Sequence, residues 1–311
     1  MDRLVARGQD SGNQLRTLFV MVGLLWVGGA GMMAFAPSAF AGLPITSVTS
    51  CGTITKAGNY EVDGTLTTQK AGDCLVVKGS NVTLNLNAQA INGSGAGAGV
   101  HVLPSAKYAY IEGRGATIGG FAQGLEIDGS NSVAENFTAT DNADAGVLLQ
   151  KAKGARVSNF TSISNVNDGV RVYSGNSNGL ADFNVLQNNR YGLWLESTTR
   201  NLAYDFTAES NALAGVYIGC FADGPHANKC SKPSMQSTSN AVYNGKSLKT
   251  TEGSQQIGVA IDLGDLGNKV ADLTIQFNAQ FDAVDENPQC GTNTWMVITY
   301  GTSNQTNGCI P

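Results

Sequence analysis

One short unit recurs along this chain at a constant interval of 23 residues. The unit reads Gly-apolar-x-apolar, and four glycines open it: Gly146, Gly169, Gly192 and Gly215. An asparagine stands four residues before each glycine, and a phenylalanine stands five residues before each asparagine. Three residue types that keep register over four repeats indicate a stacked repeat architecture, in which each unit packs on the next.

Each repeat consists of short alternating runs of apolar residues and lacks the longer periodicity of a helix. On a strand, the two apolar residues of the unit point to one face and the residue between them points to the other. We therefore expect two buried columns: Val147, Val170, Leu193 and Val216, and Leu149, Val172, Leu195 and Ile218. Columns stacked at about 4.8 Å between rungs are typical of a parallel sheet wound into a solenoid.

The asparagines, the phenylalanines and the residues before the phenylalanines form three further columns. We expect each asparagine to turn a tight corner in the left-handed conformation and to hydrogen-bond from rung to rung. The phenylalanines predict a buried aromatic stack, and the polar residue before each one is expected to turn the preceding corner. These columns are Asn142, Asn165, Asn188 and Asn211; Phe137, Phe160, Phe183 and Phe206; and Asn136, Asn159, Asp182 and Asp205.

The repeat weakens toward both ends, where Gly99, Gly124 and Gly258 open further units and Asn278 takes the ladder position. This predicts roughly nine or ten rungs in all. The segment Ser80-Asn81-Val82-Thr83-Leu84-Asn85-Leu86-Asn87, followed by Ile91-Asn92-Gly93, is similar to the opening rungs of secreted bacterial β-helix-repeat proteins.

On these motifs the chain resembles the right-handed parallel β-helix (pectin-lyase-like) superfamily over about residues 50 to 290. The resemblance implies an all-β fold, a right-handed parallel β-helix solenoid. It does not imply one activity, because this fold hosts lyases, hydrolases, epimerases, adhesins and proteins without known chemistry.

The first 41 residues differ in character from the repeats. Arg3, Arg7 and Arg16 precede an apolar run, and Ala39-Phe40-Ala41 offers a small-x-small cleavage site. We predict a cleaved secretory signal peptide, with an uncleaved anchor as the alternative. The protein is then secreted, periplasmic or extracellular and keeps no membrane span. The expected segments are a signal peptide at 1–41, an N-terminal cap at 42–74, a β-helix at 75–290 with a loop insertion at 220–230, and a C-terminal cap strand at 291–311.

An exported protein enters an oxidising environment, so its cysteines are expected to form disulfides. The six cysteines are even in number, and all of them follow the predicted signal peptide. Sequence neighbourhood favours three pairs: Cys51–Cys74, Cys220–Cys230 and Cys290–Cys309. These pairs would staple the first cap, the inserted loop and the last cap. The clustered Cys/His spacing of a metal site is missing, so no metal and no cofactor are expected.

The charge argues against anionic partners. The whole chain has a formal net charge of −5. Removing residues 1–41 takes away three arginines and two aspartates, which leaves a net charge of −6. Such a surface does not suit nucleic acid or an anionic membrane. We expect a monomer whose partner, if it has one, is a polysaccharide.

Hydrolase and lyase motifs are largely missing. Of the polygalacturonase motifs Asn-Thr-Asp-Gly, Asp-Asp, Gly-His-Gly and Arg-x-Lys, the chain matches only part of the first, at Asn167-Asp168-Gly169. An inverting glycosidase needs two carboxyl groups, so we interpret Asp168 as a turn residue. His101 is interpreted as a surface residue on an early rung. No catalytic residue is expected.

The outward position between the two buried columns carries aromatic and charged residues on consecutive rungs. We expect five of these side chains to form one contiguous patch that binds substrate: Arg171, Tyr173, Trp194, Glu196 and Tyr217. Exposed aromatic rings can stack on sugar faces while charged groups bond the hydroxyls. The alternative is that the inserted loop covers the rings and makes them part of the core.

Three classes of function remain open at this stage. The missing carboxylate pair favours an exported, non-catalytic β-helix protein that binds polysaccharide or serves as a cell-envelope or matrix component. A polysaccharide lyase or glycoside hydrolase with an atypical site is the first alternative. A self-associating structural protein is the second.

Overall fold

The computed structural model describes residues 44–68, 70–220, 233–250, 253–305 and 309–311. The predicted signal peptide at 1–41 lies outside the described residues, as does nearly all of the insertion at 220–230. The chain divides into Met1–Ala41 and Gly42–Pro311, and the description below concerns the second unit.

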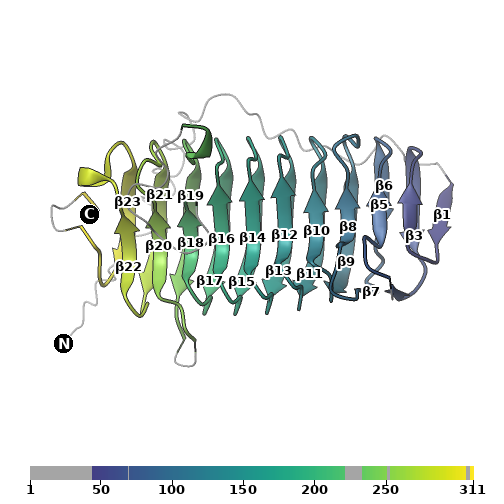
Figure 1. The fold of residues 1–311 in the computed structure, drawn as a ribbon, viewed down its shortest axis with the longest axis horizontal. Helices are drawn as coiled ribbons and strands as arrows, with labels where there is room; N and C mark the ends of the chain where they lie inside the picture. The colour runs from purple at the N-terminus through teal and green to yellow at the C-terminus, as the bar shows by residue number, and fades with distance from the viewer. Residues whose placement is uncertain (1–43, 69, 221–232, 251–252, 306–308) are drawn as a thin grey trace, which may run out of the picture. The chain divides into compact units, whose positions relative to one another are not determined.

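Two long parallel sheets wind around a shared core, and strands of successive rungs lie side by side from β1 to β23 (Figure 1). The 13-stranded sheet, called sheet A, contains β1 (Ile45–Val48), β3 (Gly58–Val62), β4 (Leu66–Thr67), β6 (Val82–Asn85), β7 (Ala90–Asn92), β9 (Tyr110–Gly119), β11 (Val133–Thr140), β13 (Arg156–Ile163), β15 (Gly179–Leu186), β17 (Leu202–Glu209), β19 (Ala241–Leu248), β21 (Lys269–Gln276) and β23 (Thr294–Tyr300). The 10-stranded sheet, called sheet B, contains β2 (Gly52–Ile54), β5 (Leu75–Val77), β8 (Ala98–Val102), β10 (Gln123–Ile127), β12 (Ala145–Gln150), β14 (Asp168–Tyr173), β16 (Tyr191–Glu196), β18 (Ala214–Ile218), β20 (Ile257–Ile261) and β22 (Phe281–Asp285).

The helical content of the described chain is two short 3-10 turns, η2 (Pro233–Met235) and η3 (Pro288–Cys290). Within that part of the chain, no helix has the length and apolar composition that crossing a membrane requires.

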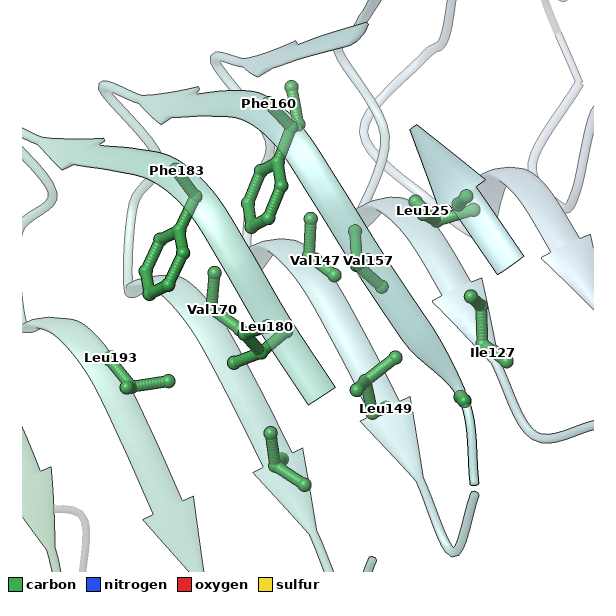
Figure 2. Close-up of a cluster of buried hydrophobic side chains, with 14 of the residues drawn as sticks. Leu125, Ile127, Val147, Leu149, Val157, Phe160, Val170, Leu180, Phe183 and Leu193 are labelled. Carbon is green, nitrogen blue, oxygen red and sulfur yellow. The ribbon is translucent and has the colours of Figure 1, made fainter. Parts of the chain in front are cut away.

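The core is made of the two apolar columns that the repeat predicts. Val147 pairs with Val170 and Val170 with Leu193, and the second column keeps the same register two residues further along each strand. Every member of both columns is buried, with at most 1% of its surface exposed. Figure 2 shows how these side chains meet those of sheet A between the two sheets. The all-β solenoid prediction is thus confirmed.

The predicted asparagine ladder is present and fully buried. Each side-chain amide donates to the side-chain oxygen of the next rung, at 3.0 Å from Asn142 to Asn165 and 2.9 Å from Asn165 to Asn188. Gln255 continues the ladder and donates to Asn278 at 2.7 Å. The expected left-handed conformation of these asparagines is wrong, because the residue before each one takes the positive φ: Asp141, Ser164, Gln187 and Ser210. The backbone turns at that residue, and the asparagine amide is left to bond the next rung.

A second asparagine ladder lies at another corner and was not predicted. Asn178 donates to Asn201 at 3.0 Å, and Asn201 donates to Asn240 at 3.0 Å. Asn240 then donates to Asn268 at 3.1 Å. The 23-residue spacing from Asn178 to Asn201 is visible in the sequence, but the inserted segment widens the next step to 39 residues.

The phenylalanine stack and the polar column before it are both confirmed. Successive rings are nearly parallel, with centroids 5.3–5.4 Å apart. The preceding residues take left-handed φ values, from 49° at Asn159 to 62° at Asn136. Each of these residues bends its strand in the middle, so sheet A is folded along one line that runs parallel to the solenoid axis.

Disulfides close both ends of the solenoid. Cys51 bonds Cys74 and Cys290 bonds Cys309, as predicted. Cys220 is also disulfide-bonded, and its predicted partner Cys230 lies outside the described residues.

Asp265 makes stability depend on pH. The residue is fully buried, and one carboxylate oxygen accepts the backbone N–H of Ser237. Burial raises the pKa of Asp265 from 3.8 to about 8, although the bond from Ser237 partly offsets this. The unfolded chain therefore releases this proton near pH 4 and the folded chain near pH 8, so stability should fall as the pH rises between those values.

We expect Asp265→Asn to weaken this pH dependence, because an amide does not ionise. Urea unfolding of both proteins at pH 5 and pH 8 measures it, with exposed Asp272→Asn as the control. If the free energy of unfolding changes as much between pH 5 and pH 8 in the Asp265 variant as in the parent, Asp265 is not the group responsible.

Candidate functional site

The outer face of sheet B carries the predicted patch, and the strand register places its members on neighbouring rungs. Arg171 pairs with Trp194 and Trp194 with Tyr217, while Tyr173 pairs with Glu196. The expected adjacency of the five residues is therefore present in the structure.

Arg171 lies at the centre of the polar half of this patch. Its Nε donates to Glu196 at 2.7 Å, and its guanidinium lies 4.4 Å from the centroid of the Trp194 ring. The Tyr173 ring is 5.3 Å away, within the range of a cation–π contact. Burial raises the pKa of Glu196, and Arg171 offsets part of that rise. Arg171, Tyr173 and Glu196 are half-buried and accessible to solvent.

The aromatic half of the patch is buried, which corrects the expectation of exposed rings. Trp194 is 1% exposed and Tyr217 is 0% exposed. The indole N–H of Trp194 donates to the Gly219 carbonyl at 2.8 Å, and the Tyr217 hydroxyl donates to Asp262 at 2.7 Å. Tyr191 contacts both rings. These rings form a second small core on the outer side of the sheet, so neither of them presents a face to a sugar.

Asp168 is not a turn residue, in contrast to our interpretation of the sequence. It is the first residue of β14, is fully buried, and accepts hydrogen bonds from Arg190 at 2.8 Å and 2.5 Å. Burial raises the pKa of Asp168, and Arg190 offsets part of that rise. Burial alone would lower the pKa of Arg190, but the Asp168 carboxylate raises it above its ordinary value. The two residues form a buried, two-pronged ion pair.

His101 is half-buried among carboxylates and does not lie free on the surface as expected. Its Nδ1 is 2.8 Å from Asp73. Its Nε2 is 3.4 Å from Asp128 and 3.9 Å from Glu126. Burial by itself would lower the pKa of His101, but the carboxylates outweigh it and raise the pKa from 6.5 to about 9. Sequence reasoning placed His101 and Glu126 in one outward column without assigning them a role.

A shallow polar groove follows the bend of sheet A. One section, of about 430 Å³, runs from Arg114 to Asn184, and the next, of about 320 Å³, runs from Asp182 to Thr274. The two sections share Asp182 and Asn184, so the groove continues across successive rungs from β9 to β21. It exists because each strand bends at a left-handed residue, which leaves a furrow along the line of the bends.

An aromatic pair lies one residue before this line of bends. Tyr204 and Tyr243 are opposite each other on β17 and β19, and their rings stack at 5.4 Å with 10° between the planes. Both are half-buried. Burial raises the pKa of Tyr204, and the negative charges of Asp182 and Asp205 raise it further. The pair was missed because the insertion breaks its 23-residue spacing.

Two glutamates meet beside the first section of the groove. Glu112 and Glu135 are opposite each other on β9 and β11, and the Tyr110 hydroxyl bridges them, at 2.9 Å from Glu112. The side chain of Asn136, which lines the groove, donates to Glu112 at 2.9 Å. Sequence reasoning found no carboxylate pair because it searched for adjacent residues, whereas the solenoid brings together residues one rung apart.

Two parallel sheets wound around one core, with ladders of stacked amides, define a parallel β-helix protein. A family model described as "Right handed beta helix region" matches residues 73–246, more than half of the chain, and the chain belongs to that family. No curated protein sequence matches the chain.

Solved structures share the fold at low sequence identity. The Dettilon tailspike protein has a TM-score of 0.60 at 14% identity, with 82% of this chain and 61% of that chain covered. DFA-IIIase from Arthrobacter chlorophenolicus A6, without its lid, has a TM-score of 0.54 at 10% identity, with 84% of this chain and 70% of that chain covered. A mutant of that enzyme in complex with DFA-III has a TM-score of 0.52 at 11% identity, with 84% and 72% covered. The chain thus spans about 61% of the tailspike's length, and these likenesses show the fold alone.

Proposed function

We propose that this protein binds a linear polysaccharide along the groove of sheet A without cleaving it. The observation that carries the proposal is the continuity of the groove over the rungs from β9 to β21. Side chains in the groove recur once per rung, about every 4.8 Å. A polymer of repeating units can make the same kind of contact at successive rungs, and one extended chain can use the whole groove.

The chemistry of the groove also suits a sugar chain. The stacked rings of Tyr204 and Tyr243 offer a half-exposed apolar surface two rungs wide. Asp182, Asp205 and Lys246 line the groove beside them and supply acceptors and donors for hydroxyl groups. Ligand sites commonly combine an aromatic surface with a few convergent polar groups.

The outer face of sheet B remains a second proposed contact surface, reduced to Arg171, Tyr173 and Glu196. The Trp194 ring packs against the Arg171 guanidinium, and the three residues Arg171, Tyr173 and Glu196 are partly exposed to solvent. Two described disulfides support a location outside the reducing cytoplasm, so we propose that the protein is exported and binds its glycan at or beyond the cell envelope.

The double variant Tyr204→Ala/Tyr243→Ala tests the groove. We expect its affinity for the bound polysaccharide to fall at least about 10-fold, because it loses the stacked, half-exposed pair of rings that lies next to the groove residues Asp205 and Asn244. Affinity electrophoresis against a panel of neutral and acidic polysaccharides measures this. Tyr108→Ala is the matched control, since this tyrosine is 51% exposed and neither it nor its two sequence neighbours line the groove.

Unchanged retention of the double variant, at unchanged thermal stability, would exclude the tyrosine pair as part of the binding surface. Loss of retention in Arg171→Ala instead would move the site to sheet B. If the parent protein binds nothing on the panel, the polysaccharide proposal itself is wrong.

Glycoside hydrolysis in the same groove is a second candidate, favoured by the Glu112/Glu135 pair. Both carboxylates reach one hydroxyl, and two carboxyl groups about 5–5.5 Å apart are the arrangement of retaining glycosidases. The same panel, read for reducing ends, distinguishes cleavage from binding. Cleavage that disappears in Glu135→Gln would make the protein an enzyme.

A further inference from the structure

Four side chains near the N-terminal end of the solenoid meet on the outer side of sheet B. Asp73 lies just before β5, His101 lies on β8, Glu126 lies on β10, and Asp128 follows β10 directly. One ligand atom each from His101, Glu126 and Asp128 lies within 4.8 Å of the others. Residues 25–28 positions apart in the sequence thus converge because they occupy consecutive rungs.

His101 Nε2 and the two carboxylates that face it, those of Glu126 and Asp128, make only weak hydrogen bonds with one another. The Nε2–Asp128 distance of 3.4 Å is longer than an ordinary N–H···O bond, and the Nε2–Glu126 distance of 3.9 Å is beyond one. The second oxygen of Asp128, Oδ1, is buried and has no hydrogen-bond partner among the described residues. A buried carboxylate oxygen without a partner is costly, so a group that bonds this oxygen would stabilise the cluster.

The other side of the imidazole is arranged differently. Nδ1 makes a short contact of 2.8 Å with Asp73, which orients the ring and holds its proton on Nδ1. Nε2 points toward Glu126 and Asp128, and it becomes a metal ligand by exchanging its own proton for the ion. A histidine that ligates a metal usually donates its other N–H to a carboxylate in this way.

We propose that His101 Nε2, Glu126 and Asp128 bind one divalent transition-metal ion, best matched by Zn²⁺, and that Asp73 is a positioning residue for the histidine. Zinc bonds of about 2.0–2.2 Å in a tetrahedral site separate the ligand atoms by about 3.4 Å. The two separations from Nε2 are 3.4 and 3.9 Å, and all three ligand atoms lie within 4.8 Å of one another, so side-chain adjustments of about 1 Å reach that geometry.

The donor set selects the class of ion. One imidazole and two carboxylates suit zinc and its neighbours, whereas Ca²⁺ and Mg²⁺ require six or more oxygen ligands. The three ligand side chains are 11–14% exposed, so solvent reaches the site and a water molecule can complete the coordination. The ion would tie β8 to β10 and would stabilise the folded protein according to its affinity. The site lies on sheet B and is independent of the polysaccharide proposal.

Titration of the purified, metal-free protein with Zn²⁺ tests the site. We expect one equivalent to bind, a rise in Tm when it binds, and visible absorption typical of tetrahedral coordination when Co²⁺ replaces it. His101→Gln and Asp128→Asn should each lose at least about 100-fold in Zn²⁺ affinity, and Asp73→Asn about 10–100-fold, the range measured for outer-shell partners.

Asp144→Asn is the matched control, because it removes an equal negative charge one rung away, where Asp144 accepts bonds from Gln123 and Asn167. It should bind Zn²⁺ like the parent protein. Unfolding of each metal-free variant separates loss of a ligand from loss of the fold. The proposal is overturned if the parent binds no Zn²⁺, if His101→Gln binds it as well as the parent, or if Ca²⁺ displaces Zn²⁺ at equal concentration.

Discussion

Replacing Arg190 with alanine is expected to lower the free energy of unfolding at pH 7 by about 3–5 kcal/mol, as removal of one partner from a buried ion pair does. Asp168 is 0% exposed, and Arg190 donates to both of its oxygens, while the backbone N–H of Tyr191 donates to one of them at 3.4 Å. The variant would leave this carboxyl without its cation. Arg190 also lies over the Trp194 ring, at 4.7 Å from the centroid, so part of the loss is lost packing on the outer aromatic core.

The loss of stability in Arg190→Ala should depend on the pH and on whether Asp168 is still present. Burial raises the pKa of Asp168, and without Arg190 the pKa rises further. The folded variant must then take up a proton, so its stability falls as the pH rises above the ordinary range of an aspartate, and the loss should be smaller near pH 4. The double variant Asp168→Asn/Arg190→Ala should recover part of the loss at pH 7, because no buried charge remains. Urea unfolding of the four proteins completes the cycle, and a loss that is the same at pH 4 and pH 7 would argue against a charge effect.

Asn188→Ala is expected to cost about 3 kcal/mol or more, because it leaves several buried polar groups without partners. The Asn188 amide donates to Asn211 at 2.9 Å and to the Ser162 carbonyl at 3.2 Å. Its oxygen accepts the backbone N–H and the side-chain amide of Asn165. Alanine removes all four bonds in the dry interior between two rungs.

The next residue provides the control for this prediction. Asn189 is exposed, so Asn189→Ala should change stability by no more than about 0.5 kcal/mol. Circular dichroism during urea unfolding compares the two variants under identical conditions. Equal stabilities would mean that the ladder does not contribute to the folded state beyond its backbone.

Most of the fold could be predicted because a solenoid repeats its packing once per turn. Val147, Val170 and Leu193 occupy equivalent places, so their spacing in the sequence is also their stacking in space. The same logic predicted the Asn142 ladder, whereas the two end disulfides were predicted from the nearness of their cysteines in the sequence. It failed where the repeat is interrupted, as at Asn201 and Asn240, which bond to each other across the insertion.

The candidate sites were harder to predict, because they depend on the directions of the side chains and on whether another part of the protein covers them. Alternation along a strand placed Trp194 on the outer side of sheet B, but it could not show whether another part of the protein covers that side. Register placed His101 beside Glu126, but not Asp73 behind the imidazole or the unpaired oxygen of Asp128.

The sequence alone therefore determined the β-helix, its buried columns, its first asparagine ladder and its two described disulfides. The β-helix, its columns and its ladder follow from contacts between a residue and its equivalent one turn away, which a constant period reveals, and the disulfides join cysteines that are neighbours in the sequence. The tertiary structure alone decided that Trp194 and Tyr217 are buried, that Arg190 neutralises Asp168, and that the bends of sheet A form a groove. Those features arise from rotamers, bends and covering segments, which carry no period in the sequence and are set by packing in three dimensions.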